Sequence, residues 1–189
     1  MPNAQDLAFV QQATASGLAE VSEGQIAVAK SFNPAVRNFG QQMVTDHTAA
    51  NNQLSAIAAQ EHIPQSPVLS GPEQQDIVTL ELLSDPEFTR TYLDMQVVDH
   101  IETLRLFLQE TRAGQDPALM MFAQEKLPVL MQHLGNAVAL DLAGRGLPPT
   151  AATVNAFISS LAPDLPRGSA AAVATPDHAH AMAIPAFPS

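Results

Sequence analysis

Three histidines interrupt the apolar stripes of three separate helical segments. His47, His100 and His133 each occupy a position where the three-four spacing of apolar residues would favour leucine. Each lies within about one turn of the midpoint of its segment, and midpoints meet whichever way the helices run. Imidazole nitrogens bind zinc, iron, copper or manganese. The pattern therefore predicts either a buried metal site or a buried network in which the histidines satisfy one another and nearby carboxylates.

Two glutamates in the first helical segment lie at the height of these histidines. Glu20 is predicted as a fourth ligand, and Glu23 follows three residues later on almost the same face. The main apolar line of that segment is expected to run through Leu7, Val10, Thr14, Leu18, Val21 and Val28. The two glutamates lie instead on a second line with Phe9, Ala13 and Ser16. They face the histidines only if this second line also turns inward.

Asp46 and Asp99 each directly precede one of the histidines. Neighbouring positions on a helix point about 100° apart, so chelation of the same ion by an aspartate and the adjacent histidine is awkward. Asp46, Asp99 and Glu23 are better suited to orient a ligand by accepting a hydrogen bond from its second nitrogen. An ordinary exposed carboxylate is an equally good interpretation for the two aspartates.

Four long helices should position these side chains, over residues of about 4–31, 34–61, 86–112 and 117–144. Asn33-Pro34 and Asp116-Pro117 are typical helix starts, and Gly114 should end the third long helix. A short helix is expected at about 73–84, inside the middle connection. The short outer links predict two antiparallel hairpins, and the long middle link favours the crossover of ferritin-like bundles, with up-down-up-down as the alternative.

The bundle is expected to occupy residues 1–146 as one domain, followed by a Pro/Ala-rich tail over 147–189. A short helix at 151–161 could pack on the bundle, and the rest of the tail is predicted to be disordered. The tail contains Asp177-His178-Ala179-His180, which could bind an ion weakly. The fold class is therefore all-α.

Composition excludes several classes of function. A formal net charge of −11 disfavours nucleic acid and anionic membranes as partners. With no cysteine, disulfides and thiolate ligands are impossible. No apolar run approaches the roughly 18 residues of a membrane-spanning helix, so we expect no membrane insertion. Phosphate loops, nucleophile elbows and HExxH sequences are lacking, which leaves hydrolase and kinase activities without support.

Four blocks in this order resemble the family called domain of unknown function 4142, over about residues 6 to 144: FVQQATASGLAEVSEGQIA (9–27), NPAVRNFGQQMVTDHTAANNQL (33–54), FTRTYLDMQVVDHIETLRLF (88–107) and LPVLMQHLGNAV (127–138). The resemblance implies a ferritin-like bundle, usually exported to the bacterial periplasm after removal of a signal peptide. It brings no assigned activity. The family's motif histidines correspond to His47, His100 and His133. The Glu-x-x-His pairs of di-iron ferritins are missing, because Val44, Val97 and Leu130 stand three residues before the histidines.

The leading hypothesis is a periplasmic bundle that holds a transition metal for sequestration, storage or stress protection. A second hypothesis is a non-catalytic envelope or stress protein that acts through a protein partner or as a homo-oligomer. A third is an oxidoreductase dependent on metal or haem, which would need an open coordination position. The sequence leaves open whether the protein is an enzyme.

Overall fold

The computed structural model describes residues 1–69 and 71–166, and all regular structure in these ranges is helical. The all-α prediction is confirmed. The helices are α1 (Ala4–Lys30), α2 (Pro34–Gln60), α3 (Gly71–Leu82), α4 (Glu87–Ala113), α5 (Pro117–Gly144) and α6 (Ala151–Leu161). Each begins and ends within two residues of the range predicted from the sequence.

Side-chain caps begin three of the four long helices, and α4 follows Pro86 without one. Asn3 and Asp6 form a reciprocal capping box at α1. Asn33 accepts a hydrogen bond from the backbone of Ala35 at the start of α2, and Asp116 caps α5 by accepting from the first backbone N–H groups of that helix. Gly114 follows the last residue of α4, as predicted.

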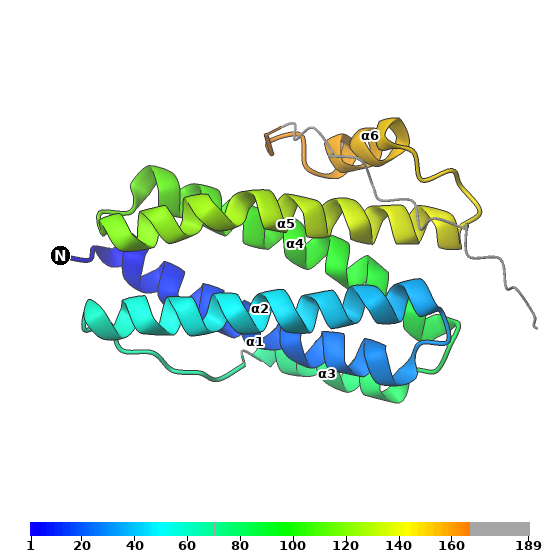
Figure 1. Cartoon of the computed structure of the whole chain (residues 1–189), viewed down its shortest axis with the longest axis horizontal. Coiled ribbons are helices and arrows are strands. Elements are labelled where there is room, and N and C mark those ends of the chain that lie inside the picture. The colour runs from blue at the N-terminus through cyan, green and yellow to red at the C-terminus, as the bar shows by residue number, and fades with distance from the viewer. Residues whose placement is uncertain (70, 167–189) are drawn as a thin grey trace, which may run out of the picture.

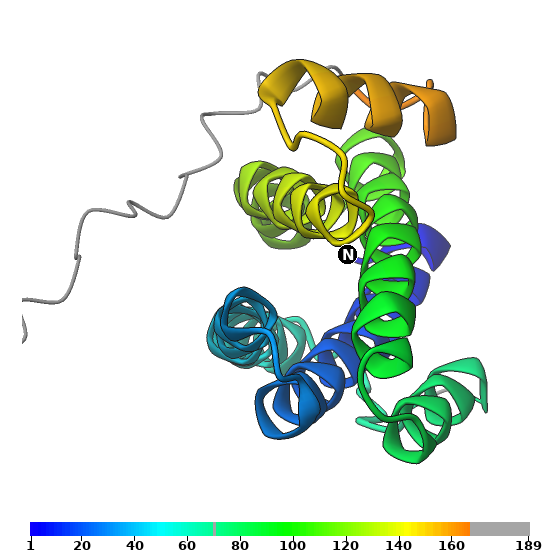
Figure 2. The same ribbon diagram turned by 90° about the vertical axis from the view of Figure 1, so that its right-hand side faces the viewer.

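The four long helices surround one core, with α3 outside them beside α1 and α4 (Figure 2). Contacts between α1 and α4 pair Asn3 with Ala113 and Ser16 with Thr103, so these two helices are antiparallel. Helix α2 is also antiparallel to α1, and it therefore runs parallel to α4. The connection that contains α3 crosses the length of the bundle (Figure 1). This is the crossover topology of ferritin-like bundles, and the up-down-up-down alternative is wrong.

The buried face of α1 is wider than the apolar spacing predicted, because Val10 and Thr14 of the expected line are buried and the second line is buried as well. Leu7 is 41% exposed, whereas Phe9 and Ala13 are buried and lie on the same side as Glu20 and Glu23. The second line does turn inward. The reason is that α1 contacts α2, α3 and α4 together, so packing on several sides overrides a single apolar stripe.

Glycines let α1 and α2 approach closely at this height. A Cβ atom on Gly24 would lie 2.7 Å from the carbonyl oxygen of Gly40, and one on Gly40 would lie 2.8 Å from the carbonyl oxygen of Gly24. Gly17 similarly faces the side chain of Asn51. Tight packing of the two helices therefore requires glycine at these positions, and it draws Glu20 and Glu23 to the interior.

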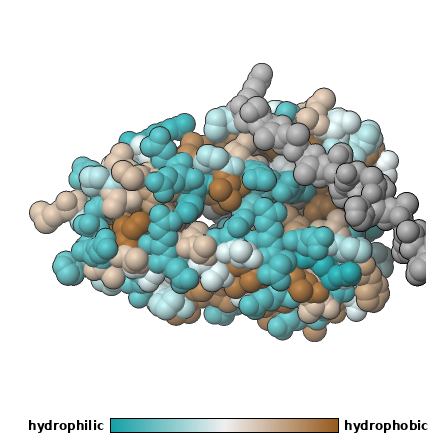
Figure 3. Space-filling view, viewed as in Figure 1, coloured by the Kyte–Doolittle hydropathy of each residue, from teal (hydrophilic) through white to brown (hydrophobic). Residues whose placement is uncertain are grey.

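Helix α6 packs against α5 and joins the core through Val154 and Ile158, together with Leu165 beyond its end. The described part of the predicted tail thus belongs to the folded unit. Asp177-His178-Ala179-His180 lies outside the described residues. The face shown in Figure 3 is covered largely by hydrophilic residues, with small separate hydrophobic patches. Within the described ranges, no helix combines the length and apolarity needed to cross a membrane.

Candidate metal centre

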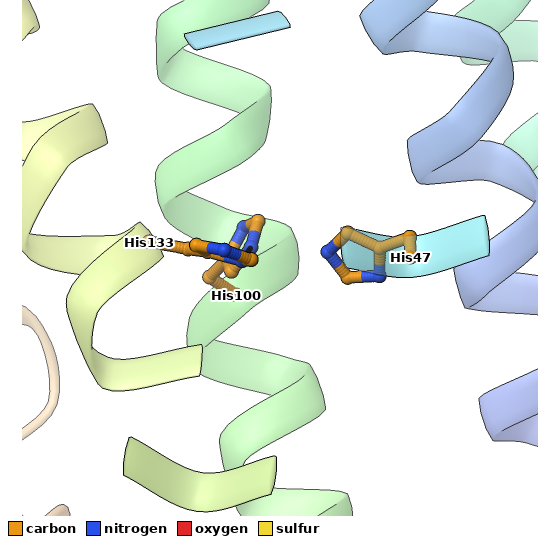
Figure 4. A group of neighbouring side chains, drawn as sticks. All are labelled: His47, His100 and His133. Atoms are coloured by element: carbon orange, nitrogen blue, oxygen red, sulfur yellow. Dashed lines mark hydrogen bonds between the residues drawn. The ribbon is translucent and has the colours of Figure 1, made fainter. Parts of the chain in front are cut away.

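The three histidines meet in the middle of the bundle. His47 comes from α2, His100 from α4 and His133 from α5, and their exposed fractions are 7%, 0% and 1%. One nitrogen from each ring lies within 4.8 Å of one nitrogen from each of the others. Figure 4 shows the rings of His100 and His133 side by side, with His47 reaching toward them from the opposite side.

The hydrogen bonds of His100 determine which of its nitrogens carries a proton. Its Nδ1 lies 2.9 Å from the backbone oxygen of Gln96, one turn earlier in α4. A carbonyl oxygen can only accept a hydrogen bond, so Nδ1 must carry the hydrogen and donate. The neutral ring then leaves Nε2 as a lone pair that points toward His133.

His133 is oriented in the same way by a carboxylate. Its Nε2 lies 2.9 Å from Oδ2 of Asp46, which comes from α2. The ionised carboxylate accepts from Nε2, and Nδ1 is left with the lone pair. Asp46 therefore makes the orienting contact expected of it, with the histidine of α5 and not with its own neighbour in the chain.

Two lone pairs consequently face each other across the site. Nε2 of His100 and Nδ1 of His133 are 3.4 Å apart, and in these tautomers neither has a hydrogen to share. Two nitrogens bound to one tetrahedral zinc at about 2.0–2.1 Å would be separated by about 3.4 Å. Nε2 of His47 is buried and has no hydrogen-bond partner among the described residues. The nitrogens of His100 and His133 thus have the spacing of two zinc ligands, and a nitrogen of His47 lies within 4.8 Å of both.

Burial keeps these imidazoles neutral. It lowers the pKa of His100 from 6.5 to about 4. It does the same for His133, where the neighbouring His100 adds to the effect and the hydrogen bond to Asp46 partly offsets it. Burial, followed by the two other histidines, lowers the pKa of His47 well below its ordinary range. Metal binding requires unprotonated nitrogens, so the group is ready to bind at neutral pH without losing protons.

Glu20 reaches the histidines from the other side of His100. Its Oε1 lies 3.4 Å from Nδ1 of His100, whereas the nitrogen that faces His133 is Nε2. The group of converging ligand atoms does not include Glu20. Glu20 is therefore placed beside Nδ1 of His100 and not among the nitrogens that could share one ion. The reason is that its line on α1 faces α4 from outside the three-histidine centre.

Gln96 links the acidic side chains to the centre, and sequence reasoning missed it. Its Nε2 donates to Glu20 at 2.8 Å and to Glu23 at 3.0 Å, while its backbone oxygen orients His100. Glu23 thus acts on the centre only through Gln96. The available signal was the four-residue spacing of Gln96 and His100, which puts both on one face of α4.

The carboxyl groups on this side hold their protons more tightly than ordinary carboxyl groups. Burial raises the pKa of Glu20 to about 7, and burial together with the charges of Glu20 and Asp99 raises that of Glu23 to about 9. The pKa of Asp99 is raised to about 8 by burial and then by Glu20 and other acidic neighbours. Asp99 lines an acidic cavity beside α1. Within residues 1–69 and 71–166, no hydrogen bond or ion pair joins it to the three imidazoles.

A second cavity, of about 170 Å³, adjoins two of the three histidines. Asp46, His47 and His133 line it together with apolar side chains that include Leu54, Phe107 and Phe122. Small molecules therefore have room beside the nitrogens. Drug-sized ligands usually need about 300 Å³ or more, so a haem or a comparable organic cofactor does not suit this space.

A family model described as domain of unknown function (DUF4142) matches residues 1–140. The chain belongs to the DUF4142 family. The match includes all three histidines, and it ends before α6. No curated protein matches the sequence.

The fold is shared with a solved structure titled "Crystal structure of DUF305 fragment from Deinococcus radiodurans". The two chains are 14% identical, the TM-score is 0.64, and the match covers 71% of this chain and 93% of the other. At this identity the likeness shows a common helical fold and nothing about activity.

Proposed function

We propose that this DUF4142 protein binds one transition-metal ion through His47, His100 and His133. The observation that carries the proposal is the pair of facing lone pairs on His100 and His133, held 3.4 Å apart. Their tautomers are set by a backbone carbonyl and by Asp46, which is how proteins commonly orient metal-binding histidines. Zinc, copper, iron and manganese all accept imidazole ligands.

The biological role that we propose is sequestration of the ion, or protection against metal stress, in the bacterial periplasm. The ligands are buried, so a bound ion would be shielded from other chelators in solution. The periplasmic compartment rests on the family resemblance alone. Fractionation of the source cells, probed with an antibody against this chain and with a cytoplasmic marker, would test it.

Metal binding is tested by titrating the tag-free full chain with zinc and with copper after removal of bound metal by EDTA. We expect one equivalent to bind tightly and to raise the melting temperature, because a ligand that binds only the folded state stabilises it. Elemental analysis of protein purified without chelator gives an independent measure of stoichiometry. Absence of binding and of any melting shift with all four metals would refute the proposal.

Two controls separate this centre from other histidines. His62→Asn removes an imidazole at the end of α2, and asparagine tolerates the positive φ of 54° found there. A second variant replaces His178 and His180 with alanine, which removes both imidazoles of the Asp177-His178-Ala179-His180 sequence. Both variants should keep the tight equivalent, whereas His47→Leu should lose it.

A second candidate, a metal-dependent oxidoreductase, is favoured by the cavity next to His47 and His133. Three protein ligands leave a tetrahedral ion one open position, as in catalytic zinc sites. Azide added to the cobalt-loaded protein would report on that position through a change in the visible spectrum. An unchanged spectrum would favour sequestration without chemistry.

The remaining alternative is a non-catalytic protein whose histidines form a structural network. In such a protein His100→Leu should leave the stability unchanged or raise it, since a buried polar group is replaced by an apolar one. In the metal-binding protein the same variant should abolish stabilisation by metal. The two outcomes are measured in one set of melting curves.

A further inference from the structure

A second, chemically different site lies between α1, α3 and α4. It is an open cavity of about 480 Å³ whose lining contains six carboxylates and neither lysine nor arginine: Glu20, Glu23, Glu73, Asp76, Asp99 and Glu102. The two deepest, Glu20 and Glu23, are 3% and 2% exposed. Burial and the neighbouring acidic groups raise the pKa values of Glu20, Glu23 and Asp99, because ionising them together would crowd like charges at low dielectric. A bound cation would stabilise the ionised carboxylates and take the place of their protons.

The side chain of Gln96 ends between these two carboxylates. Its Nε2 contacts Oε2 of both, so the two oxygens are no more than about 6 Å apart, a separation that one metal ion with oxygen ligands can close by small movements. Gln96 is 0% exposed, and its Oε1 has no hydrogen-bond partner among the described residues. A fully buried amide oxygen without a partner is costly, and this one belongs to the amide group whose nitrogen already contacts the two innermost carboxyls of the cavity.

We propose that this cavity binds a hard divalent cation such as calcium or manganese, with Glu20, Glu23 and the amide oxygen of Gln96 as its innermost ligands. Carboxylate and amide oxygens are the donors that such ions prefer. The site goes beyond the three-histidine centre, because Glu20 approaches His100 at Nδ1 and the converging nitrogens lie on the other side of that ring.

Rotation of the Gln96 amide would prepare the ligand set. In the structure, the NH₂ group bridges the two carboxylates, which suits the ion-free protein. Turning the amide by half a turn brings Oε1 toward Glu20 and Glu23 and provides a third oxygen. The backbone oxygen of Gln96, which orients His100, keeps its place during this rotation.

The single tyrosine of the chain provides a local probe. Tyr92 lies one turn before Gln96 on α4, and the chain has no tryptophan. Burial and the charges of Glu20 and Glu23 raise the pKa of Tyr92 well above its ordinary range, so its phenol is close to both carboxylates. Terbium(III), a hard ion that replaces calcium at oxygen sites, emits when an adjacent tyrosine absorbs light.

The experiment is a terbium titration of the full chain with tyrosine excitation at neutral pH. We expect saturable emission that calcium displaces. Glu23→Gln and Gln96→Leu should weaken terbium binding by about tenfold or more, because each removes an inner ligand. Glu125→Gln, the same charge change at an exposed position of α5, should bind terbium as the wild type does.

His47→Leu keeps the two proposals distinguishable, because it should lose zinc binding and keep the terbium emission. Circular dichroism of every variant confirms that the helices are retained. Absence of saturable emission would overturn the proposal, as would equal emission from Glu23→Gln. Displacement by spermidine but not by calcium would also overturn it, since the cavity would then select an organic polyamine.

Discussion

Burial shifts the pKa values of the ionisable groups on the two sides of His100 in opposite directions. On the Nε2 side, three imidazoles converge, and burial lowers their pKa values so that they remain neutral bases. On the Nδ1 side, Glu20 and Glu23 share the amide of Gln96, and burial raises their pKa values to about 7 and about 9, which favours their neutral acid forms. Both regions avoid charge, but only the bases have their lone pairs free at neutral pH.

The difference indicates which side a soft or borderline metal would choose. A nitrogen site with low pKa values loses no protons when a metal binds, whereas the carboxyl site must release them. Hydrogen bonds reinforce the contrast, since the backbone of Gln96 and the carboxylate of Asp46 take the remaining N–H groups of two imidazoles. Five predictions test this comparison.

The largest effect is expected from removal of one histidine. His100→Leu should weaken zinc binding by more than about 100-fold, because it deletes a direct ligand and leaves two. Loss of a residue that only orients a ligand typically costs about 10- to 100-fold. Isothermal titration calorimetry on the EDTA-treated protein measures the affinity, with His62→Asn as the control. Zinc affinity within tenfold of the wild type would show that the converging nitrogens are not the ligands.

A smaller loss should follow from removal of the carboxylate that orients His133. Asp46→Ala should reduce zinc affinity by about 10- to 100-fold, because Nδ1 of His133 then no longer carries the lone pair by default. The same titration applies, with Glu125→Ala as a matched change at an exposed site of α5. Equal losses in both variants would mean that net charge is responsible, and not the orientation of the imidazole.

The pH dependence of zinc binding should show the lowered pKa values. The folded pKa of His100 and of His133 is about 4. These histidines therefore stay neutral when the pH falls from about 7.5 to 5.5, whereas an ordinary histidine with a pKa of about 6.5 would be roughly 90% protonated at the lower value. Zinc affinity should accordingly change by less than about threefold over this range.

The metal-free protein provides the matching stability measurement. At His100 and His133, the unfolded chain binds more protons than the folded chain between the ordinary histidine pKa of 6.5 and the folded pKa of about 4. This contribution to stability is complete above pH 6.5 and is lost as the pH falls toward 4. The raised carboxyl pKa values act in the opposite direction, so the quantity to measure is the difference in melting temperature between His100→Leu and the wild type, which should shift in favour of the variant as the pH falls from 6.5 toward 4. A difference that stays constant across this window would contradict the lowered pKa values.

The smallest effect concerns the acidic side. The pKa of Glu23 is raised from 4.5 to about 9, so the folded chain binds more protons between these values, and stability is lost as the pH rises through them. Glu23→Gln removes this cost and should raise the melting temperature at about pH 8 by a few degrees. Little difference is expected at about pH 4, where the carboxyl is protonated in both states. A destabilised variant at the higher pH would refute the assignment.

The prediction that three histidines meet was possible because the sequence indicates two things about each residue of a helix, its face and its height along the helix. The apolar stripe gives the face of each helix, and the position between caps gives the height. His47, His100 and His133 agreed in both, so their meeting did not depend on helix direction. Glu20 agreed in height, but its face on α1 was ambiguous between two lines. The contacts of Glu20, unlike the approach of the three histidines, could not be predicted.

The sequence by itself determined the all-α class, the limits of the helices and the approach of three histidines, because caps, prolines and a 3.6-residue period are local properties of the chain. Tertiary structure decided that the second line of α1 is buried as well, since the contact between Gly24 and Gly40 sets the rotation of that helix against α2. It also decided the tautomers, because the acceptors for His100 and His133 are a particular carbonyl and a carboxylate from another helix. The hydrogen bond of His133 joins two helices and depends on distances of a few tenths of an ångström, which periodicity does not specify.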